Sequence, residues 1–177
     1  MTDQIELFLA AHGAEGMPHP GGTLLEHLIR VRGQLAAWAA APAIQVAGLC
    51  HAAYGTDGFA RSLLDLADRE QLAALIGPAA EDLVYLYGSC DRATVYPQLG
   101  VADPVVFCDR FTGDEHTPAT TDLCAFMEIT AANELDVLAH NPDLAAKYGP
   151  TLRRLFTRSR DLLSEAAVEA CERQLAA

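Results

Sequence analysis

The chain has 177 residues, enough for one domain with a sizeable core, so we expect a single domain over residues 1–177. Twenty-four acidic residues against twelve basic ones give a net charge of −12, which argues against nucleic acid as a partner because it repels the phosphate backbone. Hydrophobic residues make up 51% of the chain but aromatic residues only 7%, and the abundance of alanine and leucine predicts an all-α fold.

Periodicity is strongest in the first third of the chain. A first helix is expected over residues 3–11, before a loop rich in glycine and proline. Thr23 and Glu26 form a capping box for a second helix over residues 23–41, and a proline at position 42 suits the first turn of a third helix over residues 42–54. Their short connection predicts that the second and third helices pack as antiparallel neighbours.

The rest of the chain divides into further helices and one long loop. Residues 88–104 have no sustained period, so we predict a long loop there, of the kind that often covers a site. Capping residues and apolar periodicity predict helices over the remaining segments: residues 68–77, residues 78–87, residues 120–140, a short helix from Asn141, and a final helix from Pro150.

The cysteines and the N-terminus bear on where the protein resides. The five cysteines include no C-x-x-C pair, so the sequence predicts neither a disulfide framework nor a zinc ribbon. The first residues, MTDQIELFLAAHG, are acidic where a signal peptide would be basic, and no apolar run approaches the length of a membrane span. We therefore expect a cytoplasmic protein without a membrane partner.

Two histidines interrupt the apolar faces of the second and third helices. His27 lies three residues after Leu24 and four before Val31, and His51 lies on the inner face of the next helix. A buried imidazole is costly unless it is paired, so a single hydrogen-bonded core histidine is one interpretation of each. Because the two helices are expected to be neighbours, we predict instead that the two rings meet in a polar pocket.

A late helix carries a second polar stripe. Asn133, Asp136 and His140 are spaced by three and four residues, so their side chains lie on one side of the helix. Leu135 and Leu138 define a different, apolar side, and the polar stripe is therefore either a solvated face or part of the pocket.

The turn YGTDG after His51 supplies further candidate residues. Tyr54 lies one turn from His51 and could donate a proton to a developing oxyanion. Thr56 and Asp57 can fold back toward the helix end, where a carboxylate beside His51 would raise the pKa of the imidazole and make it a better general acid. The alternative is that Asp57 is an ordinary solvated turn residue.

Three segments carry a family resemblance. GTLLEHLIRV, AGLCHAAYGT and ITAANELDVL resemble the HD-domain superfamily, whose histidines and aspartates bind divalent metal, and the resemblance implies a compact HD-like helical bundle. It sets His27 at the first histidine, His51 and Ala52 at the His-Asp pair, and Asn133 at the late aspartate. HPGGTLLEHL with AGLCHAAYGT is also similar to an uncharacterised bacterial group of HD-like proteins that join His-x-Gly-x-Thr-Leu-Leu-x-His-Leu to His-x-x-Tyr-Gly-Thr.

The chain departs from the superfamily pattern at the metal ligands. Ala52 cannot ligate, and the amide of Asn133 is a weaker donor than a carboxylate, so a dinuclear centre is not expected. A mononuclear site built from His27, His51 and either Asn133 or Asp136 is the first expectation, and a pocket without metal is the second.

We therefore expect a small-molecule enzyme, first of all a hydrolase with one divalent metal ion and a phosphorylated or nucleotide-like substrate. Asp57 or Asp136 would accept the proton of the attacking water. His19, Thr56 and Arg110 would bind the substrate, although Arg110 could instead form an ion pair at the surface.

Two other hypotheses stay open. In one, His51, Tyr54 and His27 carry out acid–base chemistry without metal, as in an isomerase, lyase or cyclase. In the other, the domain binds a ligand or partner without catalysis. The sequence is also compatible with a homodimer.

Overall fold

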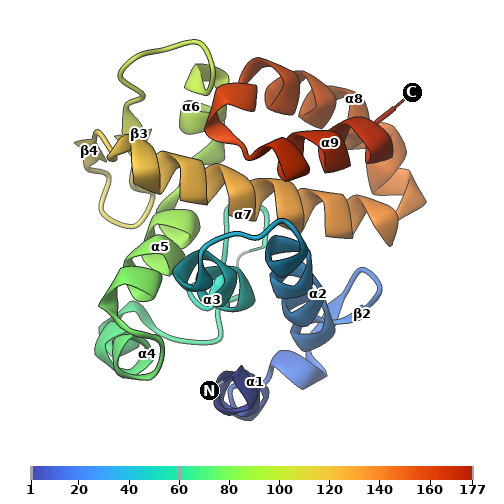
Figure 1. Cartoon of the computed structure of the whole chain (residues 1–177). Helices are drawn as coiled ribbons and strands as arrows, with labels where there is room; N and C mark the ends of the chain where they lie inside the picture. Colours follow the sequence, from blue (N-terminus) through green and yellow to red (C-terminus); the bar gives the residue numbers. More distant parts are fainter. Residues whose placement is uncertain (1, 60, 177) are drawn as a thin grey trace.

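The computed structural model describes residues 2–59 and 61–176, and these are predominantly helical (Figure 1). The helices are α1 (Thr2–Ala11), α2 (Leu24–Ala37), α3 (Pro42–Cys50), α4 (Arg69–Ile76), α5 (Pro78–Ser89), α6 (Arg92–Val95), α7 (Thr120–Ala139), α8 (Pro142–Arg158) and α9 (Glu165–Gln174). Single 3₁₀ turns occur at η1 (Ala14–Gly16), η2 (Leu66–Asp68), η3 (Tyr96–Gln98) and η4 (Arg160–Leu162).

Extended structure in the described residues is confined to two short antiparallel pairs. Strand β1 (Pro18–His19) pairs with β2 (Gly22–Thr23), and β3 (Phe107–Cys108) pairs with β4 (Glu115–His116). Helices form the core, so the prediction of a mainly helical protein is confirmed. Over the same residues, no helix combines the length and the apolar character needed to cross a membrane.

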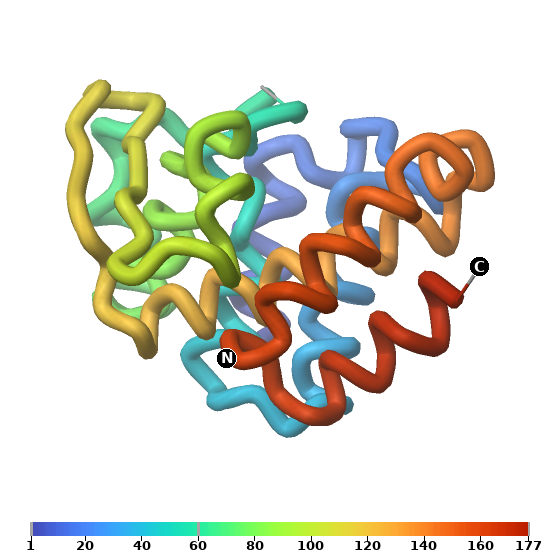
Figure 2. The backbone as a smooth tube through the Cα atoms, turned by 90° about the horizontal axis from the view of Figure 1, so that it is seen from above, coloured from blue at the N-terminus to red at the C-terminus, as the bar shows by residue number. Residues whose placement is uncertain are grey.

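Helix α7 runs through the middle of the molecule, between α2, α3 and α5 on one side and α8 and α9 on the other (Figures 1 and 2). Residues 125–133 within it are all buried, as expected for a helix that is covered around its whole circumference. Its polar side chains in this stretch therefore face protein rather than solvent.

The predicted pairing of the second and third helices is confirmed. The hydroxyl of Thr23 accepts a hydrogen bond from the backbone N–H of Glu26, and the Glu26 carboxylate accepts one from the backbone N–H of Thr23, which completes the capping box of α2. Helix α3 packs along α2 but ends at Cys50, earlier than predicted, and His51 begins a tight turn.

Two predicted boundaries are wrong. The segment predicted as a loop over residues 88–104 contains α6 and η3, because the Asp91 side chain caps the backbone N–H of Thr94. Pro150 does not start a helix: α8 begins at Pro142 and continues through Pro150, since packing of Leu152, Leu155 and Phe156 against the core outweighs the lost backbone hydrogen bond. The chain then breaks, and α9 begins after Ser164.

Gly48 sets the distance between α2 and α3. A Cβ atom at this position would overlap the buried Leu35 Cδ1 of α2. We expect Gly48→Ala to lower the free energy of unfolding by about 1–3 kcal/mol, as other overpacked core substitutions do. Gly33→Ala on α2, where the added Cβ meets nothing within 4 Å, is the matched control and should leave stability equal or higher. Urea denaturation measures both, and equal stability of the two variants would contradict this packing argument.

Candidate functional site

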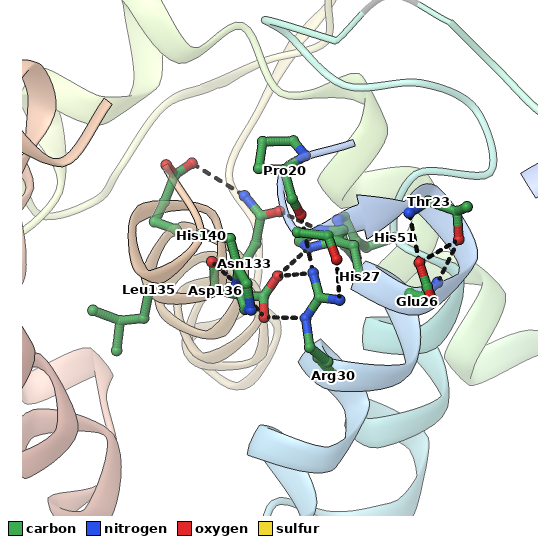
Figure 3. A network of polar contacts seen from close by, with 12 residues as sticks. Pro20, Thr23, Glu26, His27, Arg30, His51, Asn133, Leu135, Asp136 and His140 are labelled. Carbon is green, nitrogen blue, oxygen red and sulfur yellow. Dashed lines mark hydrogen bonds and ion pairs between the residues drawn. The ribbon is translucent and has the colours of Figure 1, made fainter. Parts of the chain in front are cut away.

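A buried network joins α2 to α7 through His27 (Figure 3). The ring Nδ1 of His27 lies 2.6 Å from Asp136 Oδ2, and its Nε2 lies 3.0 Å from Asn133 Oδ1. Arg30, one turn after His27, donates from Nε to Asp136 Oδ1 over 2.7 Å and from Nη2 to Asp136 Oδ2 over 3.0 Å. The His27 side chain is fully buried. Of the polar stripe of α7, Asn133 and Asp136 are therefore buried against α2, whereas His140 at the end of the helix is exposed.

Asp136 remains charged because of its two partners. Burial alone would raise the pKa of this carboxyl, but the hydrogen bonds from His27 and Arg30 outweigh burial and lower the pKa to about 2. His140 donates from Nδ1 to the backbone carbonyl of Asp136 over 2.8 Å, and the same nitrogen lies 3.5 Å from Asp136 Oδ1, so the third residue of the stripe borders the network at the helix end. Asp136 thus orients His27 and does not face the cavity described below.

His51 meets His27 as predicted. The two rings pack edge to face with their centroids 5.3 Å apart. His51 Nδ1 donates to the backbone carbonyl of Gly48 over 2.8 Å, which leaves Nε2 as the nitrogen with a free lone pair. Burial, followed by the neighbouring His27, lowers the pKa of His51 to about 3, so this imidazole is neutral near neutral pH.

His19 brings a third imidazole to the site from the β1–β2 hairpin. Its ring stacks on that of His27 at a centroid distance of 4.0 Å. Arg30 holds the hairpin in place by donating to the backbone carbonyls of Pro20 and Gly21. Burial and the adjacent His27 lower the pKa of His19 to about 4, and its Nδ1 is buried without a hydrogen-bond partner within the described residues.

A cavity of about 230 Å³ opens beside these rings. Its polar lining comprises His19, His51, Thr56, Asp57, Arg92, Asn133 and Glu134. Apolar side chains, among them Leu24, Phe59, Val137 and Leu144, form the remaining wall. His27 lies beneath this wall, behind Asn133 and His51.

Arg92 and Glu134 face each other in the cavity. Arg92 Nη1 donates to Glu134 Oε1 over 3.0 Å, and its Nη2 donates to the hydroxyl of Tyr87 over 3.3 Å. Glu134 Oε1 also accepts a hydrogen bond of 3.2 Å from Asn133 Nδ2. Arg92 is the one lysine or arginine that lines the cavity in the part of the chain that the structure describes.

Two of the predicted catalytic roles are corrected. Tyr54 donates its hydroxyl to Glu81 Oε1 over 2.7 Å, and Arg69 binds the same carboxylate, so Tyr54 belongs to a separate buried network and does not line the cavity. Asp57 lines the cavity but does not pair with His51. Its Oδ2 accepts the backbone N–H of Arg92 over 2.9 Å, and the pKa of His51 is lowered, not raised.

The predicted substrate-binding residues divide in the same way. His19 and Thr56 line the cavity, but Arg110 does not: it donates from Nε to the backbone carbonyl of Gly88 and lies over the ring of Phe111. The guanidinium of the cavity belongs to Arg92. Cys50, next to His51 in sequence, is fully buried, and burial raises the pKa of its thiol to about 12, which makes it inert as a nucleophile.

Arg92 and Glu134 were missed at the level of sequence. Arg92 lies in the segment predicted to be a loop, where no periodicity pointed to it. Glu134 precedes the cavity residue Val137 by three residues, so helical spacing places the two on the same side of α7.

Metal donors at the site are few. No group of three or more histidine, cysteine, aspartate or glutamate side chains is arranged to hold a metal ion in residues 2–59 and 61–176. The candidate donors are His27 Nε2 and Asn133 Oδ1, which are in direct contact, and the ring of His51, which packs against that of His27. Such a set suits one ion with open positions, not two.

Comparison with known proteins gives one match. Residues 8–92 are similar to a family described as "Domain of unknown function (DUF6817)". The match includes the β1–β2 hairpin, α2 and α3, with His19, His27 and His51, and ends at Arg92. Asn133 and Asp136 on α7 lie outside it. No curated protein and no solved structure matches the chain.

Proposed function

We propose that this protein is a metal-dependent hydrolase of a small phosphorylated molecule, with its active site in the cavity between His19, His51 and Arg92. One divalent ion would be held by His27, His51 and Asn133 in a compact HD-like bundle that forms a single domain. The observation that carries the proposal is the contact of 3.0 Å between His27 Nε2 and Asn133 Oδ1.

This contact brings two acceptor atoms together. Asn133 Nδ2 donates to Glu134, so the amide is oriented with its oxygen toward His27. His27 Nδ1 donates to Asp136, so a neutral ring has its lone pair at Nε2. Two lone pairs at this distance repel each other unless a positive charge lies between them. A shared metal ion supplies that charge, and a second proton on His27 is the alternative.

The surroundings of the histidines fit a metal site. Ligating histidines usually donate their second ring nitrogen to a carboxylate or a backbone carbonyl, which fixes the tautomer and the ring orientation. His27 does so with Asp136, and His51 with Gly48. When bound, a divalent ion at this position would supply Lewis-acid activation of water.

The remaining residues of the cavity support binding and proton transfer. Arg92 faces the cavity with its backbone fixed by Asp57 and its guanidinium fixed by Glu134, and it is placed to bind an anionic group of the substrate. Asp57 uses one carboxylate oxygen for Arg92, and the other remains to accept a proton. Leu24, Phe59 and Val137 exclude water from one side.

The volume limits the substrate. A cavity of about 230 Å³ lies below the usual range of about 300–1,000 Å³ for ligand pockets, so it suits a small molecule or the reacting end of a larger one. The net charge of −12 supports a small-molecule partner over nucleic acid and is compatible with the cytoplasmic location that we propose.

Metal content tests the proposal directly. Protein purified without added metal, or stripped and titrated with Zn²⁺ or Mn²⁺, should bind roughly one equivalent per chain by elemental analysis and calorimetry. His27→Ala and His51→Ala should abolish binding, and Asn133→Asp should strengthen it because a carboxylate is the better donor. His12→Ala, just after α1 and outside the cavity, is the control and should bind as the unaltered protein does. Two equivalents, or binding that survives His27→Ala, would show that the ion is held elsewhere.

A second function is favoured by the low pKa of His51. A neutral imidazole whose Nε2 faces a cavity can act as a general base without metal, and a doubly protonated His27 beside Asp136 would then satisfy the contact to Asn133. The protein would in that case be an isomerase, lyase or cyclase. Absence of metal binding at any concentration, together with loss of turnover in His51→Gln, would select this function over the hydrolase.

A further inference from the structure

A second and larger cavity, which shares no lining residue with the histidine cavity, lies between α8 and the C-terminal end of α9. It has a volume of about 1000 Å³ and is bordered by the end of α7, the middle of α8 and residues 174–176. Helices α8 and α9 lie side by side, joined by the break at residues 159–164 (Figures 1 and 2). We call this cavity the α8–α9 groove.

The floor of the α8–α9 groove is apolar and made mostly of small residues. Leu138 and Ala139 of α7, Ala145 and Ala146 of α8, and Leu175 after α9 contribute to it. Gly149 also lines the groove, and a Cβ atom added there would meet no other atom within 4 Å. The floor therefore has room along α8 for an apolar chain.

The rim of the groove is basic. Arg153, Arg154 and Arg158 line it, and no aspartate or glutamate lines it in the described part of the chain. Arg153 also borders an adjoining cavity of about 400 Å³, to which Arg160 contributes. These four arginines are one third of the twelve basic residues in a chain with a net charge of −12. Glu172 lines the adjoining cavity as well, but the rim of the α8–α9 groove itself is basic in a molecule that is acidic as a whole.

The arginines differ in how much of their hydrogen-bonding capacity is used. Arg158 donates to the backbone carbonyls of Leu99 and Tyr96, so it fixes the break after α8. Arg154 donates to Thr151. Arg153 has no hydrogen bond or ion pair to its side chain within residues 2–59 and 61–176, and it borders both cavities. Its guanidinium is the group placed to receive a ligand.

We infer that the α8–α9 groove binds an amphipathic carboxylate, with the head group on Arg153 and a linear apolar tail along the small residues of α8. A guanidinium binds a carboxylate through two parallel hydrogen bonds. The volume reaches the upper end of the usual range for small-molecule pockets, which favours a small ligand over a protein helix or a second copy of the chain. The site is separate from the histidine cavity and does not depend on the proposed hydrolase function.

Dodecanoate is the probe. Calorimetric titration into the full chain should show saturable binding of roughly one equivalent below the micelle concentration. Dodecyltrimethylammonium has the same tail but a cationic head, so it should bind at least about tenfold more weakly because it lacks the charge-assisted contact to Arg153. Butanoate has the same head but a short tail, so it should also bind at least about tenfold more weakly because it buries fewer methylene groups. Equal binding of the cationic surfactant would overturn the inference, because the arginines would then contribute nothing.

Three variants locate the site. Arg153→Gln removes the head-group contact and should weaken dodecanoate binding about tenfold or more. Ala146→Phe fills the exposed floor of the groove and should weaken dodecanoate binding as strongly as Arg153→Gln does. It should leave the circular dichroism spectrum unchanged. Arg173→Gln on α9, which removes an exposed arginine outside the groove, is the charge-matched control and should bind like the unaltered protein.

Two results would overturn the inference. Binding of dodecanoate that Arg153→Gln and Ala146→Phe leave unchanged would place the ligand elsewhere. A concentration-dependent dimer that Arg153→Gln dissociates, with no binding of dodecanoate, would assign the groove to a second copy of the chain.

Discussion

Replacement of Asp136 by alanine is expected to lower the free energy of unfolding by about 3–5 kcal/mol, the usual cost of removing one partner from a buried charged network. Asp136 accepts hydrogen bonds from His27 Nδ1 and from two nitrogens of Arg30, and its side chain is only 5% exposed. Without the carboxylate, the guanidinium of Arg30 loses its anionic partner, and the buried ring nitrogen of His27 loses its acceptor.

Asp122→Ala is the matched control because it removes a carboxylate from the exposed first turn of the same helix. This substitution should lower the free energy of unfolding by less than about 1 kcal/mol, which is the size of the interaction between one carboxylate and the helix dipole. Urea denaturation at pH 7 measures both variants. Asp136→Asn, which keeps one acceptor oxygen, should fall between them. A loss in Asp136→Ala no greater than that in Asp122→Ala would mean that the network contributes little to stability.

Asp136→Ala should also weaken metal binding if the hydrolase proposal holds. Removal of a residue that orients a ligating histidine typically reduces metal affinity by about 10–100-fold. Measured beside stability in the same variant, this effect separates two roles of Asp136. A loss of stability with unchanged metal affinity would confine Asp136 to folding.

The meeting of His27 and His51 was predictable because it depends on local signals. A capping box fixes the start of α2, periodicity fixes its buried face, and the proline at position 42 makes the connection to α3 short. Once two consecutive helices pack as neighbours, a polar residue on the inner face of each must be close to the other. Spacing alone was enough to predict that Asn133 and Asp136 lie on one side of α7. It did not show that this side is buried, because the middle of α7 is covered on all sides by other helices.

The roles of Tyr54 and Asp57 could not be derived in the same way. Helix α3 ends at Cys50, and after that point side-chain directions depend on the turn and not on helical spacing. The partner of Tyr54 is Glu81, 27 residues away, and the partner of Asp57 is the backbone of Arg92, 35 residues away. Nothing in the local sequence of either residue identifies such a partner. Arg92 itself reaches the cavity only because Asp91 caps α6.

The stability of the metal-free protein should fall steeply between pH 7 and pH 5 because of His51 and His19. Their folded-state pKa values, about 3 and about 4, lie below the ordinary value of 6.5. At pH values between the folded-state pKa and 6.5, each of these two histidines binds a proton in the unfolded chain but not in the folded chain. Protons therefore favour unfolding as the pH falls below 6.5, and the buried His51 should remove about 2 kcal/mol of stability by pH 5, whereas the partly exposed His19 should remove less because solvent screens it.

The carboxyl group of Asp136 acts in a lower window. Its folded-state pKa of about 2 lies below its ordinary value of 3.8, so its contribution is fully present above that value and is lost as the pH falls toward 2. The loss between pH 7 and pH 5 is thus assigned to the histidines. Urea denaturation of protein treated with a chelator, at intervals across this range, should show a total loss between about 2 and about 4 kcal/mol.

The variant His51→Gln tests whether His51 causes this loss. The quantity to compare is the change in the free energy of unfolding with pH, not its value at one pH. Glutamine does not titrate, so this variant should lose at most about half as much stability between pH 7 and pH 5 as the unaltered protein does, whatever its stability at pH 7. His12→Gln, at the end of α1 and outside the cavity, should keep the full pH dependence. If His51→Gln and the unaltered protein lose equal stability over this range, the pKa of His51 is the same in the folded and the unfolded chain, and burial does not lower it.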